Sequence, residues 1–124
     1  MCIRDRFWIN DKGKKFLEND LPISSQFSPI YSILIDDINN DENKDILMGG
    51  NQYRIKPEIG INDASHVSLF IGDGKGNFQV LPNKESGIFI RGQIRDILKI
   101  NIRNDEKFIF ALNNDSIKIY KFNL

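Results

Sequence analysis

The sequence contains a single cysteine and no excess charge of either sign, and these two shortages exclude several kinds of protein. Cys2 has no second cysteine with which to form an internal disulfide, so the chain is not a disulfide-stapled domain and cysteine usage does not identify a compartment. The 17 Lys and Arg residues balance the 17 Asp and Glu residues, and no long basic run is present. We therefore expect no nucleic-acid partner, because nothing would form a phosphate-binding stripe.

Long apolar runs are also lacking. No stretch approaches the roughly 20 residues that a membrane-spanning helix needs, and no secretory signal is recognisable. The 124 residues, 40% of them hydrophobic, allow one folded domain with a modest core. Residues 1–6 fit no pattern seen later, and we interpret them as a non-native start, with a longer parent chain expected upstream of Phe7.

The densest chemical signal is a run of oxygen-bearing side chains at alternate positions: Asp37, Asn39, Asp41, Asn43 and Asp45. A tight loop turns every second residue inward, so these residues can surround one hard cation such as Ca²⁺, which takes six to eight oxygen ligands. Five acidic residues and one lysine lie between Asp36 and Asp45, and without a cation their charges repel. An ordinary solvated turn is the alternative, because Asn and Asp are common turn residues.

The sequence around this loop argues against an EF-hand. An EF-hand requires Gly at the sixth position and a bidentate Glu at the twelfth, whereas the corresponding residues here are Glu42 and Met48. An EF-hand also lies between helices, but the flanking segments 30–35 and 46–50 are short, apolar and sufficiently β-branched to be strands. We therefore expect a strand–loop–strand site.

The chain contains an internal repeat. Segments 8–16 and 70–78 share an aromatic residue, an isoleucine, a Gly/Lys-rich tip and a closing phenylalanine, so that Phe78 answers to Phe16. A fixed period of short strands is typical of stacked β units. We expect strands at about 7–10, 30–36, 46–50, 66–71, 77–80, 93–101, 107–112 and 116–122, with tight turns at 73–77 and 113–116.

The segment from 52 to 65 has no clear periodicity and is expected to be a long loop. Polar and aromatic side chains on a loop have no duty in a core, so this segment supplies weak candidates for partner binding: Tyr53, Arg54, Lys56 and Glu58. The lone histidine, His66, has no nucleophile or acid at a catalytic spacing, and we expect no catalytic site.

The chain resembles the FG-GAP/VCBS repeat family in three segments taken together. These are the alternating Asp/Asn loop between two strands, the following Gly49-Gly50-Asn51 and the tip 72–78 (GDGKGNF). The resemblance implies blades of an extracellular or periplasmic β-propeller, with one Ca²⁺ held by side chains of Asp37, Asn39, Asp41 and Asp45 and by the backbone carbonyl of Asn43. Glu42 stands where the family usually has Gly. At the offset that relates Phe16 to Phe78, the second copy has Lys99, Asn101, Arg103 and Lys107, and three cations there predict a metal-free unit.

These observations predict an all-β chain of two four-stranded antiparallel blades, about 7–78 and 79–124 with shared strands, in an incomplete propeller ring. The predicted function is a non-catalytic, calcium-binding scaffold outside the cell, in the periplasm or at the cell surface, for adhesion, glycan association or protein binding. Its expected partners are an unknown protein or glycan and the remaining blades of the parent chain. The alternative is a fragment of a calcium-dependent polysaccharide-active enzyme whose catalytic residues lie elsewhere.

Overall fold

The computed structural model describes residues 6–26, 29–50 and 67–124. In this part of the chain nearly all regular structure is strand, which confirms the all-β prediction. Two single helical turns, η1 and α1, accompany the strands, and no described helix has the length and apolar character needed to cross a membrane. The elements are β1 (Arg6–Asp11), β2 (Lys15–Asp20), η1 (Ile23–Gln26), β3 (Ile30–Asp36), β4 (Asp45–Gly50), β5 (Val67–Gly72), β6 (Phe78–Leu81), α1 (Asn83–Ser86), β7 (Ile94–Ile102), β8 (Asp105–Leu112) and β9 (Lys118–Tyr120).

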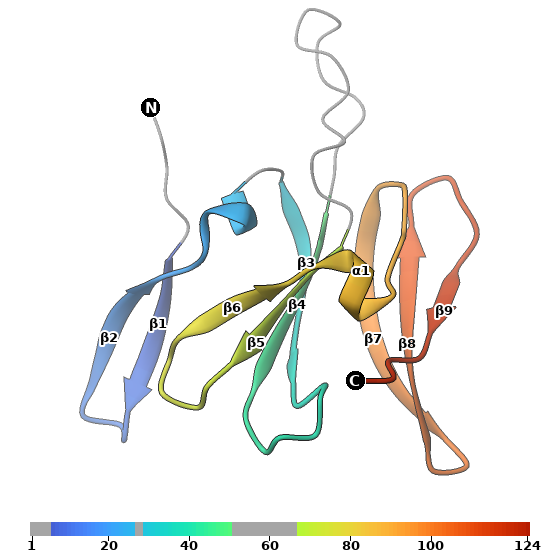
Figure 1. Cartoon of the computed structure of the whole chain (residues 1–124). Coiled ribbons are helices and arrows are strands. Elements are labelled where there is room, and N and C mark those ends of the chain that lie inside the picture. The colour runs from blue at the N-terminus through green and yellow to red at the C-terminus, as the bar shows by residue number, and fades with distance from the viewer. Residues whose placement is uncertain (1–5, 27–28, 51–66) are drawn as a thin grey trace, which may run out of the picture.

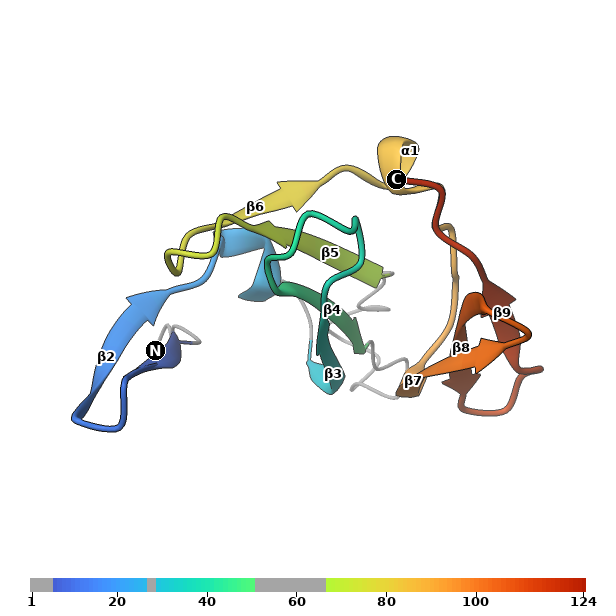
Figure 2. The same cartoon turned by 90° about the horizontal axis from the view of Figure 1, so that it is seen from below.

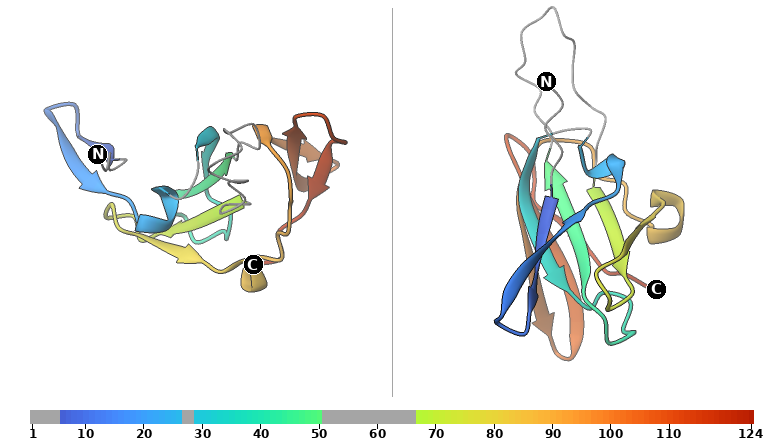
Figure 3. Two further views of the ribbon diagram at one scale, coloured as in Figure 1. Left: turned by 90° about the horizontal axis from the view of Figure 1, so that it is seen from above. Right: turned by 90° about the vertical axis from the view of Figure 1, so that its left-hand side faces the viewer.

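The strands of the described segments form three antiparallel sheets in chain order: β1-β2, β3-β4-β5-β6 and β7-β8-β9 (Figure 1). This division into two, four and three strands differs from the two four-stranded sheets that we expected. The sheets follow one another along an arc, with β3 and β7 on its concave side and β6 and α1 on its convex side (Figures 2 and 3). The faces of each sheet are therefore directed toward the neighbouring sheets along the arc, and a neighbouring sheet is what buries an apolar face.

The sequence repeat is visible in the strand registers. In the β1–β2 hairpin Phe7 pairs with Asn19 and Asn10 with Phe16, and in the β5–β6 hairpin Leu69 pairs with Leu81 and Gly72 with Phe78. Each of these β5–β6 positions follows its β1–β2 counterpart by the offset that relates Phe78 to Phe16. The two hairpins are therefore equivalent parts of successive units.

The β3–β4 and β7–β8 pairs are also equivalent, because both carry the same irregularity. The register shifts between Ile30 and Ser32 in the first pair and between Ile94 and Asp96 in the second. A β-bulge is a local feature that pairs two residues with one, so its recurrence fixes the alignment. Ile30 of β3 then corresponds to Ile94 of β7, and its partner Gly50 of β4 corresponds to Leu112 of β8. The difference in residue number between β3 and β7 is therefore larger by two than that between β4 and β8.

The main core lies between the four-stranded and three-stranded sheets. Leu47 and Leu69 of the former pack with Ile97, Phe108 and Phe110 of the latter, and all five are buried. The opposite face of the four-stranded sheet carries a second, smaller cluster of Ile46, Met48 and Phe70, against which Leu21, Ile30 and Phe78 pack. The four-stranded sheet is thus apolar on both faces, as expected for a sheet stacked between two others.

Polar contacts on the concave side join β3 to β7. Ile97 donates its backbone N–H to Ser32 Oγ at 3.0 Å, and Ser32 Oγ donates to Asp96 Oδ1 at 3.1 Å. The Arg95 guanidinium carbon lies 4.1 Å from the centre of the Tyr31 ring. Both bulges therefore take part in the sheet-to-sheet contact, which explains why an extra residue recurs at this point of each unit.

Candidate metal-binding loop

The Asp/Asn-rich segment lies between the end of β3 and the start of β4, and no described helix flanks it. This confirms the predicted strand–loop–strand arrangement. The loop is at the lower end of the four-stranded sheet in Figure 1, next to the turn that joins β5 to β6. The two are in contact, because a Cβ built on Gly74 of that turn would lie 2.3 Å from Asn43 Oδ1. Gly74 has φ +73°, so glycine satisfies both the close approach and the backbone conformation there.

Hydrogen bonds wrap the first half of the loop around Asp37. The Asp37 carboxylate accepts the backbone N–H of Asp41 on Oδ1 at 3.1 Å and that of Glu42 on Oδ2 at 2.9 Å. Asn39 Oδ1 accepts the same Asp41 N–H at 3.2 Å. The side-chain oxygens of Asp37 and Asn39 therefore converge on one backbone amide.

Asp41 forms the next link in the same network. Its carboxylate accepts the Asn43 backbone N–H at 2.8 Å and the Asn39 side-chain amide at 2.9 Å. The Asn39 side-chain amide, followed by the Asn43 backbone amide, holds the pKa of Asp41 below its usual value, because both bonds favour the charged form. The Asp41 side chain is exposed, so it stays a charged oxygen donor at the surface.

Asp45 occupies a different environment from the other four residues. Its side chain is completely buried, and its Oδ2 accepts the backbone N–H groups of Ile38 at 2.9 Å and Asn39 at 3.3 Å. Its Oδ1 accepts the backbone N–H of Gly72, at the end of β5, at 3.0 Å. A buried carboxylate with three amide donors holds a loop firmly. Asp45 therefore ties the loop to the neighbouring strand through hydrogen bonds that need no metal.

Two residues in the loop have left-handed backbone conformations, Asn40 with φ +61° and Glu42 with φ +68°. Asn tolerates this region because its short side chain bonds locally, whereas Glu has no such compensation. A glycine at position 42 would adopt this φ without strain, because it has no Cβ.

A lysine from the following sheet contacts the edge of the loop. Lys99 Nζ lies 2.7 Å from Asp36 Oδ2 and 2.9 Å from Glu106 Oε1. The hydrogen bond from Lys99 lowers the pKa of Asp36, and the same bond raises the pKa of Lys99. The local acidity is thus partly neutralised on the side that faces β7.

The loop offers the ligand chemistry of a calcium site, with carboxylate, amide and backbone oxygens close together. Among the described residues, however, no three acidic, histidine or cysteine side chains are placed so that they could hold a metal ion together. The reason is visible in the hydrogen bonds, because Asp45 turns to buried amides while Asp37 and Asp41 stay in the exposed turn. The donor types fit a hard cation, and Asp37, Asn39 and Asp41 are the residues whose side chains would meet it first.

The corresponding segment of the next unit has a different form. Because the offset is larger by two at β7 than at β8, the connection there is two residues shorter. The strands run on to Ile102 and Asp105 and are joined by Arg103 and Asn104, both with positive φ, as in a tight hairpin turn. The single offset used in the sequence comparison therefore matches Lys99, Asn101 and Arg103 to the wrong positions of the loop. It matches Lys107 to Asp45 correctly.

Sequence reasoning missed the role of Gly72, which donates to Asp45 and lies so close to Lys44 that a Cβ would be 2.2 Å from its carbonyl oxygen. In the sequence, the glycine-rich tip that begins at Gly72 indicates only a turn. The candidate partner-binding residues Tyr53, Arg54, Lys56 and Glu58, like His66, lie outside the described residues. A scan of protein-family models and searches of curated proteins and of solved structures found nothing that matches this chain.

Proposed function

We propose that this chain is a non-catalytic repeat scaffold of the β-propeller type, in which the loop from Asp37 to Asp45 binds one Ca²⁺. The observation that carries the proposal is a network within one turn between paired strands. Side-chain oxygens of Asp37 and Asn39 meet at the Asp41 backbone amide, and the Asp41 carboxylate accepts the backbone amide of Asn43. The loop is already wrapped by its own amides, so a cation would need to displace little structure to gain its ligands.

Stacking of equivalent units supports the scaffold part of the proposal. The β1–β2 and β5–β6 hairpins share one register, and the β3–β4 and β7–β8 pairs share one bulge. Units of this kind bury apolar faces against their neighbours and present loops at their ends. The calcium loop lies at one such end, where a bound ion would fix the shape of a surface rather than take part in a reaction.

The expected affinity favours a location outside the cell or in the periplasm. Extracellular calcium modules bind with Kd values of roughly 10⁻⁴ to 10⁻³ M, and free Ca²⁺ of about 1 mM would then add about 0.4 to 1.4 kcal/mol of stability. Such a site fills only where calcium is abundant. The ion would order the loop, while the apolar faces would provide most of the stability of the fold.

Isothermal titration with CaCl₂ tests this proposal. The unmodified chain is expected to bind one equivalent, and Asp41→Ala is expected to weaken binding by at least about tenfold, because a charge-bearing ligand is lost. Asp115→Ala is the matched control, since Asp115 lies in the turn between β8 and β9 and its loss changes the net charge equally. Equal binding by the Asp41→Ala and Asp115→Ala variants would rule out the loop as the site.

A further inference from the structure

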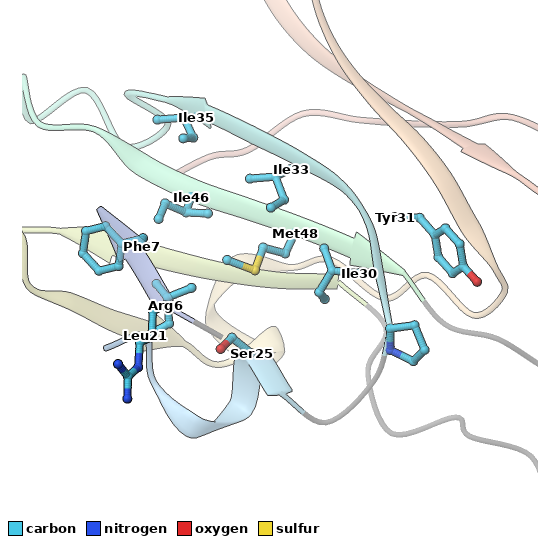
Figure 4. A pocket seen from close by; sticks show the side chains of 11 residues that line it. Arg6, Phe7, Leu21, Ser25, Ile30, Tyr31, Ile33, Ile35, Ile46 and Met48 are labelled. Carbon is cyan, nitrogen blue, oxygen red and sulfur yellow. The ribbon is translucent and has the colours of Figure 1, made fainter. Parts of the chain in front are cut away.

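An apolar groove of about 610 Å³ lies between β1 and the strands β3 and β4 of the four-stranded sheet (Figure 4). Ile33 and Ile35 of β3 and Ile46 and Met48 of β4 line one side, and Phe7 of β1 lines another. Ile33 and Ile35 are 56% and 60% exposed. Two neighbouring isoleucines on one strand face with this exposure indicate a surface that another element covers.

The repeat shows what covers the equivalent surface one unit later. Ile33 corresponds to Ile97 by the shared bulge, and Ile97 is only 3% exposed. Ile97 is covered by β4 of the preceding sheet, where a Cβ built on Gly49 would lie 3.0 Å from Ile97 Cδ1 and 2.7 Å from Ile94 Cγ2. Strand β4 of the four-stranded sheet thus packs on β7, the first strand of the next sheet.

We infer that the groove binds a β-hairpin with the residue pattern of β3–β4, and that a further repeat ahead of β1 in the same polypeptide supplies this hairpin. The inference rests on the proposed repeat scaffold and specifies its nearest partner. Within the described residues, β1 pairs only with β2, and its other edge faces the groove. A hairpin added at that edge would give the first sheet four strands, as in the sheet of β3 to β6.

The register of the added hairpin follows from the equivalence of β1 and β5. Ile46 pairs with Phe70, Leu47 with Leu69 and Met48 with Ser68. The counterparts of Phe70, Leu69 and Ser68 in β1 are Trp8, Phe7 and Arg6, by the offset that relates the two hairpins. The second strand of the added hairpin would therefore place its Ile46-like, Leu47-like and Met48-like residues opposite Trp8, Phe7 and Arg6.

One local feature specifies the hairpin further. The residue that corresponds to Gly49 must be small, since it would meet Ile30 and Ile33 as Gly49 meets Ile94 and Ile97.

The test is a lengthened chain in which a second copy of residues 29–66 is joined directly to Asp5. Ile33→Cys reports on the groove through its rate of reaction with a maleimide, and Cys2→Ser removes the native thiol from the unlengthened chain. The rate at this introduced thiol is expected to fall about tenfold or more on lengthening, because burial of a thiol blocks its reaction. Ile119→Cys on β9, where Ile119 is 59% exposed, should react at the same rate in both chains.

A matched lengthened chain carries Val in place of Gly49 in the added copy, and the thiol of Ile33→Cys should remain reactive there, because the extra side chain would clash. Should a lengthened chain fail to fold, the same 29–66 segment is added as a separate peptide to the unlengthened protein. Unchanged labelling of the Ile33→Cys variant in both formats would overturn the inference. Calcium titration of the same proteins reports separately on the 37–45 loop, so failure of the proposed function and failure of this inference are distinguishable.

Discussion

Replacement of Glu42 by glycine is expected to stabilise the protein, although Gly usually destabilises. Glu42 has φ +68°, and the left-handed region costs a residue with a Cβ about 1 to 2 kcal/mol. Glycine escapes this cost but has more freedom to lose on folding, which offsets about 0.4 to 1 kcal/mol. The net expected gain is about 1 kcal/mol, measured against Glu42→Ala, which removes the same charge and keeps the strain.

Urea denaturation and thermal melting of the Glu42→Gly and Glu42→Ala variants provide the assay, with chelator and with calcium. A gain of about 1 kcal/mol corresponds to a rise in Tm of roughly 4 °C for a domain of this size. Asn40→Gly serves as a second control. Asn40 has φ +61°, but asparagine tolerates this region, so its gain should be smaller than that at position 42.

The outcome that would refute this reasoning is a Glu42→Gly variant no more stable than Glu42→Ala in the presence of chelator. The loop would then not hold position 42 in the left-handed region in solution.

Three further predictions concern the contacts around the loop. Asp45→Ala should cost about 3 kcal/mol in urea denaturation with or without calcium, because it leaves three amides around a buried position without their acceptor; an effect seen only with calcium would show that Asp45 is chiefly a ligand. Gly72→Ala should cost about 2 kcal/mol by the same measurement, since its Cβ would lie 2.2 Å from the Lys44 carbonyl oxygen; a neutral result would mean that β5 and the loop separate freely. Lys99→Met should lower the free energy of unfolding by about 1 kcal/mol at neutral pH, because it removes the ion pair with Asp36. The pKa of Asp36 in the folded state lies below its ordinary 3.8, so the loss of stability should persist above pH 3.8 and vanish as the pH falls through the lowered pKa. A loss independent of pH would contradict the ion pair.

Short apolar strands can be predicted from sequence, and the β2 strand cannot. Segment 30–36 forms β3 with the predicted bounds, and segment 46–50 forms β4, which begins one residue earlier at Asp45. By contrast β2 (Lys15–Asp20) mixes charged and apolar residues without alternation, and most of its side chains are exposed. It is a strand because the turn after β1 returns the chain alongside it. The single turns η1 and α1 are four residues each, too short to show a helical period.

The repeat can also be recognised from sequence, but not the boundaries of its sheets. Segments 8–16 and 70–78, which match in sequence, lie in hairpins of the same register. Sequence similarity does not show which strands share hydrogen bonds, so a grouping of two, four and three strands cannot be told from two groups of four. The two-residue difference between the loops becomes visible only through the shared bulge at Ile30 and Ile94.

Alternation predicts five inward-facing ligands, whereas the structure separates Asp45 from the others. Its partner Gly72 belongs to a strand far along the chain, and no spacing rule within the loop could reveal that contact. The hydrogen bonds of Asp37 and Asn39 to the Asp41 amide, by contrast, join residues within the loop. Contacts between near neighbours in the chain can be expected from spacing, whereas the contact between Asp45 and Gly72 cannot.

The measurement that tests calcium binding most directly is a CaCl₂ titration followed by the backbone amide resonances of the isotopically labelled protein. We predict that the amides of Asp41 and Glu42, which donate to Asp37, shift first and most, with a Kd of about 10⁻⁴ to 10⁻³ M. Amides of the β7–β8 turn at Arg103 and Asn104 should remain unchanged. If calcium leaves Asp41 and Glu42 unshifted at millimolar concentration, the loop is a solvated turn and the proposed calcium scaffold is wrong.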